Sequence, residues 1–60
     1  MNLNDMISIV KNCLGNDSMV ETVDSIDEMQ RNIDIDQLTN SEMLAFNELQ
    51  DVLWSYYSGK

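Results

Sequence analysis

Residues 38–57 read LTNSEMLAFNELQDVLWSYY and carry the strongest helical signal in the chain. Thr39-Asn40-Ser41-Glu42 has the form of a capping box, in which the first and fourth residues satisfy each other's backbone N–H groups. Leu38 before the box and Met43 after it have the spacing of a hydrophobic staple. The segment predicts a helix from about Asn40 to Tyr57, followed by a frayed end over residues 58–60. The apolar stripe of this helix consists of Ala45, Phe46, Leu49, Val52, Leu53 and Tyr56.

Two shorter helical patterns precede this segment. The first runs from about Leu3 to Leu14, with Asn2 placed to cap it and Gly15 placed to end it in the left-handed conformation. The second runs from about Met19 to Ile33, and Ser18-Met19-Val20-Glu21 at its start also has the form of a capping box. Spacings of i, i+3, i+4 and i+7 give each helix one apolar face. The two faces consist of Leu3, Met6, Ile7, Val10, Cys13 and Leu14, and of Met19, Val23, Ile26, Met29 and Ile33.

The three patterns predict an all-α fold in a single acidic domain covering residues 1–60. Short connections favour antiparallel packing of sequential helices. The expected architecture is a small three-helix bundle, or a helical hairpin plus a third helix, completed by homodimerisation. A chain of 60 residues buries only about 60% of its unfolded surface. Since the single cysteine, Cys13, cannot form an internal disulfide, we expect a homodimer to supply the missing stability.

The chain carries a formal net charge of −8, from 11 acidic residues against Lys11, Arg31 and Lys60. This charge repels phosphate groups, so it argues against direct binding of nucleic acid or of an anionic membrane. It favours a basic host protein as partner, including one with a nucleic-acid-binding surface. The sequence shows neither a secretion signal nor an apolar run that could span a bilayer, and a lone cysteine suits a reducing compartment. We therefore expect a cytoplasmic protein, in the host cytoplasm if a phage encodes it.

The first candidate binding feature is a row of acidic residues along the second predicted helix. Asp17, Glu21, Asp24 and Glu28 recur at i, i+4, i+7 and i+11, on a line roughly opposite the apolar face, and Asp27 widens the row. Successive carboxylates would lie about 4.5–6 Å apart along the axis, comparable with the phosphates of one nucleic-acid strand. The row predicts a partner-binding surface, including a mimic of nucleic acid. The alternative is the solvated outer face that any amphipathic helix presents.

The second candidate feature is an aromatic shoulder on the third predicted helix. Met43 and Trp54 lie 11 residues apart on one side of that helix, beyond the apolar stripe, and Tyr57 flanks them. Leu44 stands alone among polar neighbours. Because Trp and Tyr are enriched at protein interfaces, the shoulder predicts a surface for a second copy or for a foreign partner. The alternative is that the bundle buries all three side chains in its core.

The sequence offers little for catalysis or for metal and cofactor binding. It contains no histidine and no glycine-rich phosphate loop, and Cys13 on an apolar face is expected to be a small buried hydrophobic residue. Asp34-Ile35-Asp36 resembles the start of a calcium loop, but the glycine and the final glutamate are missing at the required distances. We therefore expect no catalytic residue, no metal and no cofactor, and a protein that is not an enzyme.

Ser25-Ile26-Asp27, Leu38–Met43, Phe46 and Asp51 stand in an order that resembles the Hha/YmoA family of small helical nucleoid modulators. The likeness covers part of the chain and requires a short deletion, and the basic residues that accompany the family pattern are absent. The resemblance implies a helical protein that binds a nucleoid-structuring partner. The small, proline-free, Asn- and Asp-rich chain also resembles early bacteriophage proteins, many of which inhibit host enzymes or defence systems.

Three functional hypotheses follow from these features. The leading one is a small acidic protein-binding module, of the phage type that inhibits a host enzyme or defence protein. The second is a nucleic-acid mimic that occupies the basic cleft of a protein handling DNA or RNA. The third is an Hha-like modulator of a nucleoid or transcription protein.

Overall fold

The computed structural model describes residues 1–59, and over this range the protein is all-helical without a strand. Helix α1 spans Leu3–Cys13, α2 spans Val20–Arg31 and α3 spans Asn40–Ser58. Short 3-10 helices lie in the two connections, η1 at Asp17–Met19 and η2 at Ile35–Gln37. The three predicted helices are thus confirmed, although α2 is shorter than expected and α3 continues to Ser58. The expected fraying of Lys60 lies outside the described residues.

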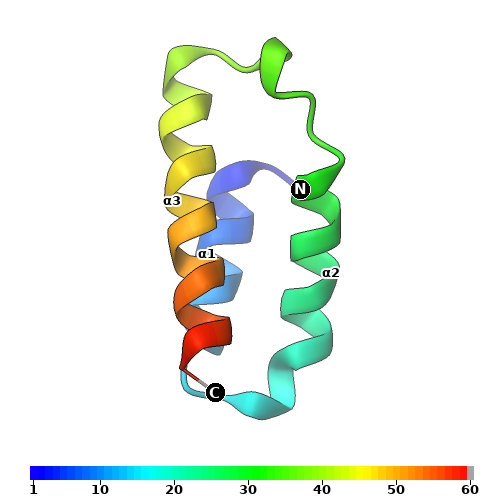
Figure 1. The fold of residues 1–60 in the computed structure, drawn as a ribbon, viewed down its shortest axis with the longest axis vertical. Coiled ribbons are helices and arrows are strands. Elements are labelled where there is room, and N and C mark those ends of the chain that lie inside the picture. Colours follow the sequence, from blue (N-terminus) through cyan, green and yellow to red (C-terminus); the bar gives the residue numbers. More distant parts are fainter. Residues whose placement is uncertain (60) are drawn as a thin grey trace.

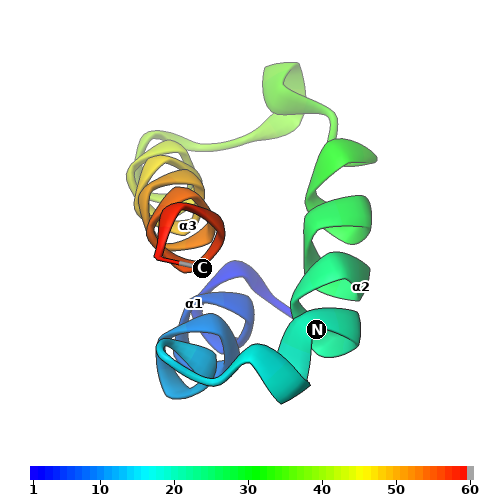
Figure 2. The same cartoon turned by 60° about the horizontal axis from the view of Figure 1, so that its bottom comes forward.

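The helices form an antiparallel three-helix bundle in which α1 and α3 run in the same direction (Figure 1). Seen from its end, the bundle is triangular, and α2 stands apart from α3 (Figure 2). The packing of α1 against α3 is the most extensive, and that of α1 against α2 comes second. Helix α1 therefore packs against both other helices, whereas α2 and α3 meet along a looser seam. Along residues 1–59, no helix has both the length and the apolar character needed to cross a membrane.

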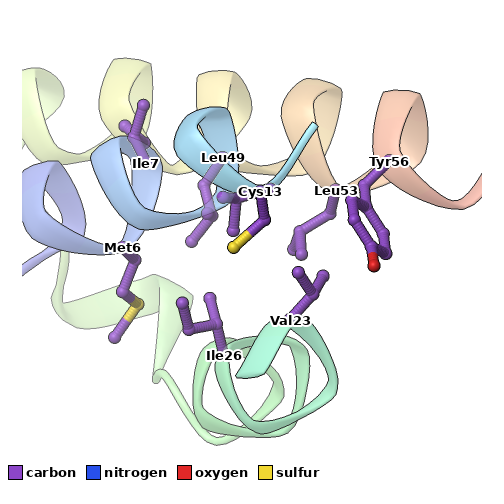
Figure 3. Packing of buried hydrophobic residues seen from close by; sticks show 9 residues of the cluster. Met6, Ile7, Cys13, Val23, Ile26, Leu49, Leu53 and Tyr56 are labelled. Carbon is purple, nitrogen blue, oxygen red and sulfur yellow. The ribbon is translucent and has the colours of Figure 1, made fainter. Parts of the chain in front are cut away.

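The core lies where the apolar faces of the three helices meet (Figure 3). Val10, Val23 and Leu49, one from each helix, have no solvent-exposed surface. Cys13 is a buried free thiol among them, as its place on the apolar face predicts. The rest of the buried cluster consists of Met6, Ile7, Ile26, Leu53 and Tyr56. The hydroxyl of Tyr56 donates a hydrogen bond of 2.8 Å to the backbone carbonyl oxygen of Asn16, which ties the end of α3 to the α1–α2 connection.

The predicted apolar faces were wrong at two positions. Leu14 is exposed because α1 ends at Cys13 and Leu14 is only its C-cap. Met29 is exposed as well, and the neighbouring Gln30 is buried in its place. Gln30 lies one turn beyond Ile26 and two turns beyond Val23, so it shares the inward-facing side of α2. The orientation of α2 therefore turns Gln30, rather than Met29, toward the interior.

The ends of α1 follow the prediction, whereas the start of α2 does not. The Oδ1 atom of Asn2 accepts a hydrogen bond from the backbone N–H of Asp5, and Gly15 has a φ of 79°, the left-handed value expected after a helix. The predicted capping box at Ser18 is wrong. Asn16 accepts hydrogen bonds from both the backbone N–H and the hydroxyl of Ser18, which starts η1 before α2 begins.

The capping box at the start of α3 is confirmed in both directions. The backbone N–H of Glu42 donates to Oγ1 of Thr39 at 3.2 Å, and the backbone N–H of Thr39 donates to Oε1 of Glu42 at 3.0 Å. The backbone hydrogen bond from Thr39 lowers the pKa of Glu42, and the hydrogen bond involving the Thr39 side chain lowers it further. The ionised carboxylate is thus the form that the helix end stabilises.

This arrangement predicts a pH-dependent contribution of Glu42 to stability. Since the pKa of Glu42 is lower in the folded state than in the unfolded chain, its stabilising effect is complete above the ordinary glutamate pKa. The effect is lost as the pH falls through the lowered folded value. Urea unfolding of the wild type and of Glu42→Gln should therefore differ at pH 7 and converge at strongly acidic pH. Glu21→Gln removes the same charge away from the box and is the control; an equal pH dependence for both variants would contradict the assignment.

Candidate protein-binding surface

The outer face of α3 exposes two large apolar side chains. Trp54 is 72% exposed and Leu44 is 73% exposed, the highest values among the large hydrophobic residues that the structure describes. Ten residues separate them, so at 100° per residue their directions differ by about 80° and their axial separation is about 15 Å. Asn47 and Asp51 lie between them on the same side of the helix. Single exposed leucines are common on protein surfaces, but an exposed tryptophan in a well-formed helix is a candidate contact residue.

The predicted shoulder is only partly present, because its three members differ in exposure. Trp54 is exposed, whereas Met43 and Tyr57 are half-buried. The hydroxyl of Tyr57 donates a hydrogen bond to Oδ1 of Asp24, so its ring leans toward α2. Burial raises the pKa of Tyr57, and the hydrogen bond to Asp24 raises it further. Of the predicted shoulder, Trp54 alone presents its side chain fully to solvent.

A groove of about 410 Å³ runs along the seam between α2 and α3, and Trp54 lines it. Leu53 belongs to the buried core and also lines the groove, so it supplies an apolar floor. Among residues 1–59, the lining consists of Asp27, Arg31, Gln50, Asp51, Leu53, Trp54 and Tyr57. The groove therefore combines acidic, aromatic and apolar surfaces from two helices, next to the most exposed aromatic ring of the described chain.

The seam between α2 and α3 also holds a polar network that the sequence analysis missed. Nε2 of Gln50 donates to Oε1 of Gln30 at 2.5 Å, and Nε2 of Gln30 donates to Oδ1 of Asp27 at 3.0 Å. Asp27 also forms an ion pair of 3.1 Å with Arg31, four residues further along α2. The available signal was the position of Gln30 on the apolar face of α2. A buried amide there requires a hydrogen-bonding partner on a neighbouring helix.

Gln50→Ala is expected to lower the free energy of unfolding by about 1–3 kcal/mol, because it leaves the buried carbonyl oxygen of Gln30 without its donor. Chemical denaturation monitored by circular dichroism measures this change. Asn47→Ala, an exposed position on the same helix, is the matched control and should change stability by no more than about 0.5 kcal/mol. Equal stabilities for the two variants would show that the amide pair does not hold α2 to α3.

The structure rearranges the predicted acidic row. Asp17 belongs to η1, so the helical line starts at Glu21 and includes only Glu21, Asp24 and Glu28. Asp24 accepts a hydrogen bond from Tyr57 of α3, whereas Asp27 accepts one from Gln30 within α2. Among residues 1–59, the two ion pairs are Lys11–Glu48 and Arg31–Asp27. The exposed carboxylates of Asp17, Glu21 and Glu28 are therefore left facing solvent without a cation from the described chain.

A second hollow lies at the end of the bundle where α1 begins, and the sequence analysis did not anticipate it. Its volume is about 460 Å³, and it lies among the N-terminal turn of α1, the α2–α3 connection and the first turns of α3. Its apolar lining comes from Met1, Leu3, Met6, Ile33, Leu38 and Ala45, and its polar lining from Asn2, Asn4, Ser41 and Glu42. Ile33 and Leu38, on either side of η2, thus contribute their side chains to this hollow.

Comparison with protein families, with curated proteins and with solved structures finds no match for this chain. The features of the surface that bear on function are the exposed Trp54, the groove beside it and the nearby carboxylates.

Proposed function

We propose that this protein is a small acidic protein-binding module, an inhibitor or adaptor of the type that phages direct against a host enzyme or defence protein. The observation that carries the proposal is the exposure of Trp54 on the outer face of α3. A tryptophan buries a large area in a complex and is among the residue types that dominate binding energies. Its place beside a groove gives a partner side chain a site to enter. The single buried thiol is compatible with action in a reducing compartment such as the host cytoplasm.

The partner is proposed to be basic. Each chain carries a net charge of −8, and the exposed carboxylate of Asp51 lies three residues from Trp54 on the same side of α3. A basic surface would be attracted to this face and would associate with it faster than a neutral one. A homodimer through the same face would place this carboxylate near its symmetry mate. Self-association thus remains an alternative use of Trp54, one that high salt should strengthen.

The alternative function is a nucleic-acid mimic, and the observation that favours it is the set of unpaired carboxylates at Asp17, Glu21 and Glu28. These groups are exposed, and within residues 1–59 none of them forms an ion pair. A basic cleft that binds phosphates could accept them instead. This function requires the acidic side of α2, whereas the leading proposal requires the outer face of α3.

A capture experiment with three baits separates these functions. The baits are the wild type, Trp54→Ala, and a triple variant with Asp17→Asn, Glu21→Gln and Glu28→Gln. Asp24 is left intact because it binds Tyr57, so the triple variant changes charge without loosening the seam. Host lysate is passed over each bait at low and high salt, with and without excess duplex DNA, after circular dichroism has verified folding.

Loss of the partner with Trp54→Ala, and retention with the triple variant, is the expected result. The opposite pattern, together with competition by duplex DNA and loss at high salt, would replace the leading proposal with the nucleic-acid mimic. Capture of a nucleoid-structuring protein would point to the Hha-like modulator. Retention of one partner by all three baits would show that neither surface makes the contact. A sedimentation experiment on the wild type alone measures any homodimer.

A further inference from the structure

We infer that the groove between α2 and α3 receives an arginine side chain from the basic partner protein. The inference rests on the proposed function and adds the chemistry of the contact. Three properties of the groove support it: an aromatic rim, a carboxylate beside that rim, and an apolar floor.

The rim and the carboxylate come from neighbouring positions on one helix. Asp51 and Trp54 both line the groove, and both are exposed. They are three residues apart on α3, a spacing at which side chains of a helix are neighbours. Among residues 1–59, Asp51 takes part in neither an ion pair nor a side-chain hydrogen bond. A cation held by Asp51 would therefore lie beside the indole ring, where the ring face attracts it further.

The opposite wall is already balanced in charge. Asp27 is paired with Arg31 and accepts a hydrogen bond from Gln30, so its carboxylate is occupied. The remaining charge of the lining is that of Asp51, with Asp24 close by through its hydrogen bond to Tyr57. The charged residues of the described lining thus leave a net negative charge, which favours a cation over an anion. Its volume of about 410 Å³ is near the small end of the range of about 300–1,000 Å³ for ligand pockets.

Arginine fits these surfaces better than lysine does. A guanidinium group is planar, so it can stack on the Trp54 ring while its N–H groups donate to the Asp51 carboxylate. Its three methylene groups would lie on Leu53, the apolar floor. An ammonium group is compact and more strongly hydrated, and it would gain less from stacking. Arginine is therefore the expected occupant, and the test compares it with lysine.

The test is a nuclear magnetic resonance titration of the ¹⁵N-labelled wild-type protein with N-acetyl-arginine amide. N-acetyl-citrulline amide, which has nearly the same shape without the charge, is the first control, and N-acetyl-lysine amide is the second. Ionic strength is held constant throughout. Saturable shifts are expected for the Trp54 indole N–H and for the backbone amides of Asp51 and Leu53. Citrulline should give none, and lysine should bind more weakly than arginine.

Two variants locate the contact. Asp51→Asn is expected to weaken arginine binding about fivefold, which corresponds to an ion pair of about 1 kcal/mol. Glu28→Gln removes the same charge from an exposed position outside the groove and should leave binding unchanged. Trp54→Leu keeps an apolar side chain but removes the aromatic face, and it should weaken binding at least about twofold. Because all three positions are exposed, each variant is expected to fold.

Several results would overturn the inference. Equal weakening by Asp51→Asn and Glu28→Gln would show only the general attraction of a negative protein for a cation. The same conclusion would follow from shifts that do not saturate or that spread over all acidic residues. Shifts as large with citrulline as with arginine would show that the charge is not recognised. Tighter binding of lysine would refute the choice of arginine. Failure here is distinguishable from failure of the proposed function. If Trp54→Ala loses the captured partner while arginine does not bind the groove, the binding module stands and the arginine contact is wrong.

Discussion

Leu49→Ala is expected to lower the free energy of unfolding by about 2–5 kcal/mol, the range seen when a buried leucine is truncated in a packed core. Leu49 has no exposed surface and lies in the cluster shared by all three helices. A domain of 60 residues has a total stability of only about 3–9 kcal/mol, at 0.05–0.15 kcal/mol per residue. The variant should therefore lose a large share of the stability of the fold, and near the lower end of the range it would be unfolded at room temperature. Thermal and urea unfolding followed by circular dichroism measure the loss.

The same helix provides a matched control at Leu44. Leu44→Ala removes the same atoms from a side chain that is exposed on the outer face of α3. Its expected effect on the free energy of unfolding is within about 0.5 kcal/mol, as for other surface substitutions. If both variants lost equal stability, α3 would be rotated differently in the bundle, and the outer face that presents Trp54 would no longer be defined.

Much of the fold could be predicted from local sequence because the signals are local. The capping box at Thr39, the cap at Asn2 and the left-handed Gly15 each depend on interactions within a few residues. The periodic apolar positions then give the number of helices and most of the core. The error at Ser18 has a local cause too. Asn16, two residues earlier, accepts hydrogen bonds from the backbone N–H and the hydroxyl of Ser18, and two capping residues so close together make the start of a helix ambiguous.

The remaining features of the core and of the candidate site depend on how the helices are rotated against each other. The periodicity of the sequence does not specify this rotation. Met29 and Gln30 are adjacent, and the buried one, Gln30, has its hydrogen-bond donor in Gln50, which lies 20 residues away in the sequence. Tyr57 was assigned to an open shoulder, but it leans on Asp24 of another helix. Trp54 was correctly selected as an accessible aromatic side chain. The groove beside it was not predicted, since its walls come from two helices that meet only along a loose seam.

Trp54→Ala is expected to lower the affinity for the partner protein while leaving the stability of the fold nearly unchanged. The side chain is exposed, so its removal should change the free energy of unfolding by no more than about 0.5 kcal/mol. In the complex, by contrast, the loss of a central tryptophan should cost about 2 kcal/mol or more, a decrease in affinity of about 30-fold. Isothermal titration calorimetry with the captured partner measures the affinity, and urea unfolding measures the stability. Ser55→Ala, an exposed neighbour on α3, is the control for both experiments.

The pair of measurements matters more than either one, because the two explanations of Trp54 give opposite patterns. If Trp54 stabilises the chain by packing along the α2–α3 seam, the variant loses stability, and its affinity decreases only in proportion to the unfolded fraction. If Trp54 is a contact residue, stability is retained and the dissociation rate rises, since most effects of interface substitutions appear in that rate. A variant that keeps both stability and affinity would remove Trp54 from the interface. The carboxylates of Asp17, Glu21 and Glu28 would then be the remaining binding surface, and the basic cleft of a nucleic-acid-handling protein would be the partner to test.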